Sequence, residues 1–145
     1  TLYLLKEASS HNITLITDIG VRLPANLTAS GRAMLSHLPE VQVRALFPNA
    51  RDFVDRTGRG PQTLSALHAI LRTEKRRGYA LEEGFISDGY SSVACPVFDH
   101  LGQPVAAVGL TFRSEKIDQA NREILIKSVQ DSANKLTVGF GGRHP

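Results

Sequence analysis

The sequence predicts an α+β domain in which an antiparallel sheet carries helices packed on its faces. Its 145 residues fit one domain that is long enough to bury a core. Strand-like segments come first, helical segments follow, and further strand-like segments precede a last helix. This order is typical of α+β domains rather than of doubly wound α/β domains. The last two strand-like segments are joined by residues 99–103 alone, a connection that favours a tight antiparallel hairpin.

The N-terminal elements are predicted from short apolar and β-branched runs. Residues 2–5 and 13–17 fit strands, and the polar residues 6–12 fit the turn between them. Residues 21–23 fit a short third strand. We therefore expect this part of the chain to contribute strands to the sheet.

A helix is predicted over residues 28–38, with Thr28 as its N-cap. The residues of its first turn, Ala29, Ser30 and Gly31, are all small. The first amides of a helix lack internal partners and carry partial positive charge, so a small anion could approach them here without meeting a bulky side chain. An ordinary cap explains the same residues, and this segment on its own does not establish a ligand site.

Two further helices are predicted in the first half of the chain. A short one begins at Pro39, whose fixed φ suits a first helical turn, and ends before Pro48. Residues 49–61 fit a loop, whose Gly-Arg-Gly run lacks the Lys-Ser or Lys-Thr that a phosphate loop requires. Residues 62–77 show the clearest helical stripe, and the basic residues at their end precede Gly78, which suits a helix C-terminus.

The second half of the chain is predicted to form three strands and a closing helix. The strands cover residues 79–82, 91–98 and 104–113, and Gly102 takes a positive φ in the hairpin turn between the last two. The helix covers residues 118–140. Its apolar residues recur at spacings of three and four, which predicts that it buries Leu125, Val129, Ala133, Leu136 and Phe140.

The strand predicted over residues 104–113 presents two different faces, because successive side chains of a strand alternate. One face suits a core and carries Ala106, Val108, Leu110 and Phe112. The other face is small or hydroxylated and carries Val105, Ala107, Gly109 and Thr111. A pocket between this second face and the helix that begins at Thr28, flanked by the hydroxyls of Tyr90 and Ser92, would suit a small molecule. The alternative is that a helix backbone packs closely on the glycine.

Composition excludes several classes of function. The net charge is +3 with scattered basic residues, and the densest basic group is explained by the end of the helix at residues 62–77. Because no helix-turn-helix pattern is present, this chain is not expected to bind duplex DNA by itself. No apolar run approaches the ~20 residues that a membrane span requires.

The single cysteine, Cys95, excludes an intramolecular disulfide and favours a cytoplasmic protein. It lies in an apolar strand, where a free cysteine acts as a small hydrophobe. The five histidines show no metal-ligand spacing. We therefore expect no metal, no cofactor and no enzymatic activity. An enzyme that uses Cys95 or Glu82 is the disfavoured alternative, since neither has a paired base in the sequence.

Four segments form a set that is more specific than any one of them. They are Thr28-Ala-Ser-Gly-Arg-Ala-Met-Leu35, Arg76-Arg-Gly-Tyr-Ala80, Val93-Ala-Cys-Pro-Val-Phe-Asp99 and Pro104-Val-Ala-Ala-Val-Gly-Leu110. In order and spacing this set resembles the C-terminal effector-binding domain of the IclR family of bacterial transcriptional regulators. The resemblance runs from Thr1 to about Gly142.

The resemblance implies a GAF-like fold, a curved antiparallel sheet of five or six strands cupped around a ligand pocket. It also implies a homodimer or tetramer, and operator binding through an N-terminal winged helix-turn-helix domain that this sequence does not contain. A small organic acid bound in the domain would modulate that binding. The pocket implied by the family falls on Leu15, Leu23, Ala29, Ser30, Gly31, Glu82, Tyr90, Ser92, Gly109 and Thr111, with Glu82 near its rim.

Two departures from the family pattern bear on the effector. Members that bind small keto acids often carry serine at the positions of Gly109 and Thr111, and cysteine at that of Ser92. Here Gly109 enlarges the space and Tyr90 adds an aromatic wall, so a larger aromatic or acyl-chained acid is favoured over glyoxylate or pyruvate. The competing hypothesis is a structural oligomerisation domain that has retained no ligand.

Overall fold

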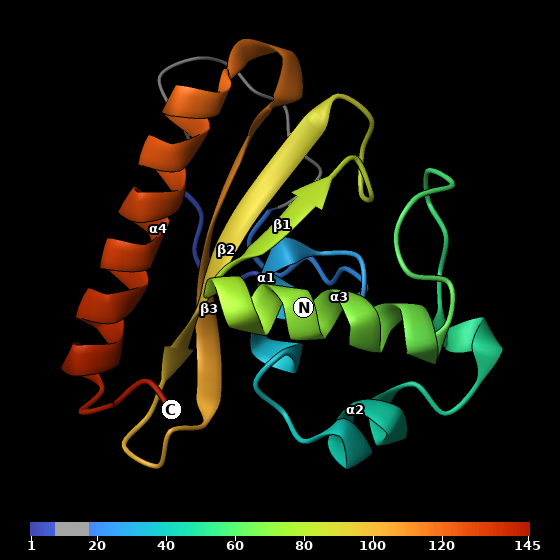
Figure 1. Cartoon of the computed structure of the whole chain (residues 1–145), viewed down its shortest axis with the longest axis horizontal. Coiled ribbons are helices and arrows are strands. Elements are labelled where there is room, and N and C mark those ends of the chain that lie inside the picture. The colour runs from blue at the N-terminus through green and yellow to red at the C-terminus, as the bar shows by residue number, and fades with distance from the viewer. Residues whose placement is uncertain (8–17) are drawn as a thin grey trace.

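The computed structural model describes residues 1–7 and 18–145, and it confirms the α+β class. In the described residues a three-stranded antiparallel sheet is accompanied by four α-helices (Figure 1). In chain order the elements are α1 (Ala29–Leu35), α2 (Glu40–Leu46), α3 (Leu64–Arg77), β1 (Ala80–Glu83), β2 (Tyr90–Phe98), β3 (Pro104–Arg113) and α4 (Gln119–Gly139). Short 3-10 turns cover Ala50–Asp52 and Ser114–Lys116.

The N-terminal segment differs from the prediction. Instead of a strand over residues 2–5, Leu2 makes a single antiparallel bridge with Arg22, which also reduces the strand predicted at 21–23 to that bridge. The Tyr3 amide donates to the Val21 carbonyl at 3.1 Å. The strand predicted over residues 13–17 lies outside the described residues, and the described part of the sheet has fewer strands than the five or six that the resemblance implied.

The helix boundaries follow from their caps. Thr28 accepts a hydrogen bond from the Gly31 amide at 3.1 Å, so the predicted N-cap of α1 is confirmed, although the helix ends at Leu35 rather than at residue 38. Thr63 caps α3 in the same way, so α3 begins at Leu64, two residues after the predicted start. Gly78 ends α3 with a left-handed φ of 79°, a conformation that glycine adopts without strain.

The sheet has the order β1-β2-β3, and each neighbouring pair is antiparallel. The predicted hairpin between β2 and β3 is confirmed. Asp99 Oδ1 accepts hydrogen bonds from the amides of Leu101 and Gln103, both at 2.9 Å, and Gly102 has a φ of 72°. Because the connection is short and its register is fixed by these bonds, the side-chain pattern of β3 is locked to that of β2.

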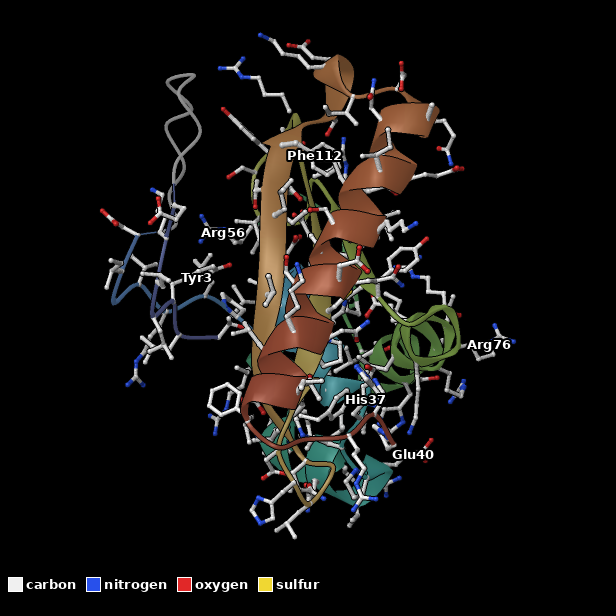
Figure 2. All side chains as sticks on the ribbon, turned by 90° about the vertical axis from the view of Figure 1, so that its left-hand side faces the viewer. Tyr3, His37, Glu40, Arg56, Arg76 and Phe112 are labelled. Carbon is white, nitrogen blue, oxygen red and sulfur yellow. The ribbon has the colours of Figure 1, made fainter. Side chains whose placement is uncertain are left out.

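Each face of the sheet packs against a different helix (Figure 1). The large residues of β3 lie on a core face, as predicted, and that face packs against α4; Figure 2 shows Phe112 between β3 and α4. The small residues on the opposite face pack against α1, whose Ala29 and Ala33 meet Ala80 and Ala94. A separate cluster joins α1 to α2 and α3: Leu35, Val43, Phe47, Phe53, Leu67 and Leu71.

The buried stripe of α4 is narrower than predicted. Val129, Ala133 and Thr137 are buried at spacings of four, whereas Leu136 and Phe140 are 47% and 58% exposed. The prediction for these two side chains was wrong, because a stripe at spacings of four leaves residue 136 to one side of it. Among the described residues no helix combines the length and apolarity needed to cross a bilayer.

Candidate functional site

The sheet brings together three of the predicted site residues in one row. Glu82 on β1 lies opposite Ser92 on β2, and Ser92 lies opposite Thr111 on β3. The Ser92 and Thr111 hydroxyl oxygens are 2.9 Å apart and share a hydrogen bond. Both side chains are half-buried, so this hydroxyl pair is within reach of a ligand on the face of the sheet opposite α4.

The next row along the sheet contains Gly109, which lies opposite Ala94. A Cβ atom at Gly109 would stand 2.9 Å from the Ser30 hydroxyl of α1, so α1 lies directly against this row. The close packing of a helix on the strand glycine, the alternative raised by the sequence, is therefore present. Gly109 itself stays exposed, so the open part of the face begins at the edge of α1 and runs toward Thr111.

Tyr90 and Arg113 form the row beyond the hydroxyl pair, and they lie opposite each other on β2 and β3. The Arg113 guanidinium carbon is 5.7 Å from the centre of the Tyr90 ring, within the range of a cation–π contact. Arg113 was not among the predicted site residues. The alternation that placed Gly109 and Thr111 on one face also places residue 113 there, and this signal could have found it.

The start of α1 is less open than predicted. The Gly31 amide already donates to Thr28, and a Cβ at Gly31 would collide with the main chain of Ala25. Gly31 is therefore required for close packing, and its amide does not face a ligand. Ala29 is buried, whereas Ser30 is half-buried. Of the three first-turn residues, Ser30 is the one that borders the open face.

Two other predicted site residues are buried, and one is not described. Leu23 is 9% exposed, and its amide donates to the Thr1 carbonyl at 3.0 Å. Glu82, expected near the rim of the pocket, is instead 2% exposed. Leu15 lies outside the described residues.

The Glu82 carboxylate is occupied by the loop that follows β1. It accepts hydrogen bonds from the amides of Phe85 and, at 3.2 Å, Ile86. Burial raises the pKa of Glu82, and these two amides, the Ser92 hydroxyl and the Arg32 charge oppose that rise. Glu82 therefore fixes the loop between β1 and β2, and in its ionised form it places negative charge beneath the β1 side of the face.

A buried ion pair behind the site was missed by the sequence analysis. Arg32 on α1 is 0% exposed, and its Nε lies 3.1 Å and 3.2 Å from the two carboxylate oxygens of Glu74 on α3. Its Nη atoms donate to the carbonyls of Asn26, Leu27 and Leu81 at 3.2, 2.9 and 2.8 Å. Arg32 thus ties α1 to α3, to β1 and to the turn before α1. The Gly-Arg pair was visible in the sequence, but nothing local indicated its partner.

Cys95 lies on the α4 face of the sheet, away from these rows, and is 3% exposed. Its thiol contacts the Gly78 carbonyl at 3.6 Å, and burial raises the pKa of the thiol to about 11. A thiol with this pKa is protonated at neutral pH and is a poor nucleophile. In the part of the chain that the structure describes, His, Cys, Asp and Glu side chains form no group that could hold a metal ion.

Two open hollows lie elsewhere on the molecule, and none of the predicted site residues lines either of them. One, of about 680 Å³, lies against α4 and has Cys95 and Pro96 in its wall. The other, of about 620 Å³, lies beside the β2–β3 hairpin and is lined by residues including Lys75 and Arg143.

Comparisons with known proteins agree with the fold and with the sequence motifs. Residues 1–138 match the model of the family described as bacterial transcriptional regulator IclR C-terminal. The glycerol operon regulatory protein of Streptomyces coelicolor is 30% identical over 128 residues, which cover 87% of this chain and 49% of that protein. The chain therefore spans about half the length of this curated relative.

Solved structures show the same fold. The repressor BlcR of Agobacterium tumefaciens superposes with a TM-score of 0.80 at 28% identity, over 87% of this chain and 51% of that one. A putative IclR-type transcriptional regulator from Silicibacter superposes with a TM-score of 0.87 at 22% identity, over 96% of this chain and 54% of that one. The GAF-like class predicted from the resemblance is confirmed by these likenesses.

Proposed function

This chain is the C-terminal domain of a member of the IclR family of bacterial transcriptional regulators, and on that basis we propose that it senses a small organic acid. The acid is an aromatic or acyl-chained effector that binds on the sheet face opposite α4. Operator DNA is bound by an N-terminal domain outside this sequence, and the domain described here also mediates assembly into a homodimer or tetramer. Occupancy by the acid modulates operator binding through that assembly.

The observation that carries the proposal is the hydroxyl pair of Ser92 and Thr111 beside the exposed Gly109. The Ser92 hydroxyl bonds both Thr111 and the Glu82 carboxylate, which leaves Thr111 with acceptor capacity for a further partner. Gly109 adds no side chain to this face, and Ser30 of α1 lies against it, so α1 borders the face beside these polar anchors. Small-molecule sites combine such polar anchors with apolar surface.

The remaining predicted residues have distinct roles in this proposal. Ser30 and Tyr90 border the open face and contact the effector. Gly31 and Glu82 shape the site without touching it, because the Gly31 amide and the Glu82 carboxylate already have partners. Leu23 and Ala29 are buried and support the start of α1 from within.

A thermal-shift screen of organic acids tests the proposal. Binding to the folded state raises the free energy of unfolding by about 2.7 kcal/mol when the ligand is at a hundredfold Kd. Acids that stabilise the wild type are then measured with Gly109→Leu, which adds a bulky side chain where α1 borders the face, and with Thr111→Val, which removes one hydroxyl at nearly constant shape. The matched control is Thr73→Val on the exposed side of α3, where the hydroxyl bonds only the Ala69 carbonyl.

We expect the acid to stabilise the wild type and Thr73→Val, to stabilise Thr111→Val less, and to leave folded Gly109→Leu unaffected. Equal stabilisation of all four proteins would place the ligand elsewhere. A screen in which no acid stabilises the wild type would favour the structural oligomerisation domain.

A further inference from the structure

We propose that Arg113, held over the Tyr90 ring, is the charged anchor for the effector's carboxylate. The effector is then an aryl- or acyl-chain carboxylic acid that lies along β3 with its carboxylate at Arg113 and its apolar part over the Ser92–Thr111 pair, toward Gly109. This inference rests on the function proposed above and adds the residue that selects for acids.

The first support is the shared face. Residues 109, 111 and 113 alternate with Phe112, which packs toward α4 (Figure 2), so Arg113 belongs to the opposite face together with Gly109 and Thr111. Arg113 also lies in register with Tyr90, one row beyond the hydroxyl pair. The cation–π contact at 5.7 Å keeps the guanidinium on that row.

The second support is the free charge of Arg113. Among residues 1–7 and 18–145 no carboxylate lies within ion-pair distance of Arg113, and the remaining segment, residues 8–17, contains no Asp or Glu. By contrast, Arg32 and Arg122 are each paired with a glutamate. A guanidinium with unused parallel N–H donors matches a carboxylate in a bidentate geometry.

The third support is the position of the negative charge beneath the face. Glu82 lies on β1, and Arg113 lies on β3, on the far side of β2. Two strand spacings separate β1 from β3 by about 9.5 Å. A ligand carboxylate is therefore repelled least by Glu82 when it binds at the β3 side.

The separation of the anchors sets the class of acid. Gly109 and Arg113 are four residues apart on one strand, which is about 13 Å. A two- or three-carbon acid bound at Arg113 would end before the Ser92–Thr111 row. A longer chain or an aryl group extends from the carboxylate over that row toward Gly109, so longer acids gain contacts that short acids lack.

Calorimetric titration of this chain tests the inference. The probes are phenylpropionate, hexanoate, pyruvate and the neutral amides of the first two acids. The key variant is Arg113→Gln. The matched control is Arg76→Gln, which removes an equally exposed charge from α3, on the other side of the molecule from Tyr3 in Figure 2. Tyrosine emission gives an independent readout of binding next to Tyr90, because the chain has no Trp and only three Tyr.

We expect Arg113→Gln to weaken binding of the longer acids by about 10- to 100-fold, the range for a charge-assisted hydrogen-bonded pair, with little change for the amides. Arg76→Gln should bind all probes like the wild type, and pyruvate should bind more weakly than the longer acids. Equal acid binding by wild type and Arg113→Gln, or an equal loss for acids and amides, overturns the inference. If Gly109→Leu still abolishes binding in that case, the proposed function stands without the role of Arg113. If the wild type binds none of these acids, both the proposed function and the role of Arg113 are refuted.

Discussion

Glu74→Gln tests whether the buried pair behind the site holds the domain together. The substitution keeps the shape of the side chain and removes its charge, which leaves the Arg32 guanidinium ionised and unpaired in the interior. Arg32 and Glu74 are 0% and 2% exposed, so water cannot replace the lost partner. Breaking one side of such a buried pair costs about 3–5 kcal/mol of the free energy of unfolding.

For a domain of this size that loss corresponds to a fall in Tm of about 10 °C or more. The assay is thermal and urea unfolding followed by circular dichroism near pH 7, at one fixed protein concentration because the domain is proposed to oligomerise. The matched control is Glu83→Gln. Glu83 pairs with Arg122 at 2.8 Å but is 54% exposed, and a surface pair is worth about 0–1 kcal/mol.

A second variant separates the charge from the hydrogen bonds. Replacing both Arg32 and Glu74 by leucine removes the unpaired charge, yet it also leaves the carbonyls of Asn26, Leu27 and Leu81 without their donors. We therefore expect the double variant to remain clearly less stable than the wild type, since each buried unsatisfied group costs about 1–3 kcal/mol. The reasoning is refuted if Glu74→Gln and Glu83→Gln unfold within about 1 kcal/mol of each other.

Three further predictions concern other parts of the fold. Native Cys95 should react slowly with a thiol reagent at neutral pH and quickly after unfolding; rapid labelling of folded protein would reopen the enzyme hypothesis. Gly142→Ala should destabilise the domain, because the added Cβ collides with the Phe98 carbonyl. Gly139→Ala meets open space and should leave the stability unchanged or raise it by about 0.5–1 kcal/mol. Equal unfolding midpoints of the two variants would contradict this contrast. Burial lowers the pKa of His37 from 6.5 to about 4, with neighbouring positive charge adding to the effect. The unfolded chain therefore takes up this proton first, and stability should fall as the pH drops from 6.5 toward 4, less so in His37→Gln; identical pH profiles of the two proteins would argue against it.

In the described part of the chain, the sequence predicted best those elements whose boundaries are set by nearby residues. Thr28 caps its own helix, Gly78 ends α3 through its own backbone freedom, and Asp99 with Gly102 closes the β2–β3 hairpin. Each of these needs only neighbours a few residues away, so the residue types and their spacing are sufficient. The faces of β3 were predictable for the same reason, because alternation is a property of any strand.

The predictions that were wrong depend on partners far along the chain. The pairing of Leu2 is set by its bridge to Arg22 and not by the apolar run around it. The spacing of apolar residues along α4 could not show that Leu136 falls outside the buried stripe. Glu82 was expected near a rim, but the loop that folds back onto its carboxylate buries it.

The candidate site shows the same division. By itself the sequence determined which residues are small, hydroxylated or charged, and the family resemblance named several residues that share the sheet face opposite α4. Tertiary structure alone decided that Ser30 stands over Gly109, that Ser92 bonds Thr111 and that Arg113 lies on Tyr90. It also paired Arg32 with a glutamate 42 residues away. The physical reason is that caps, turns and alternation are set within a few residues of the chain, whereas strand register and helix packing are set by the burial of the whole core.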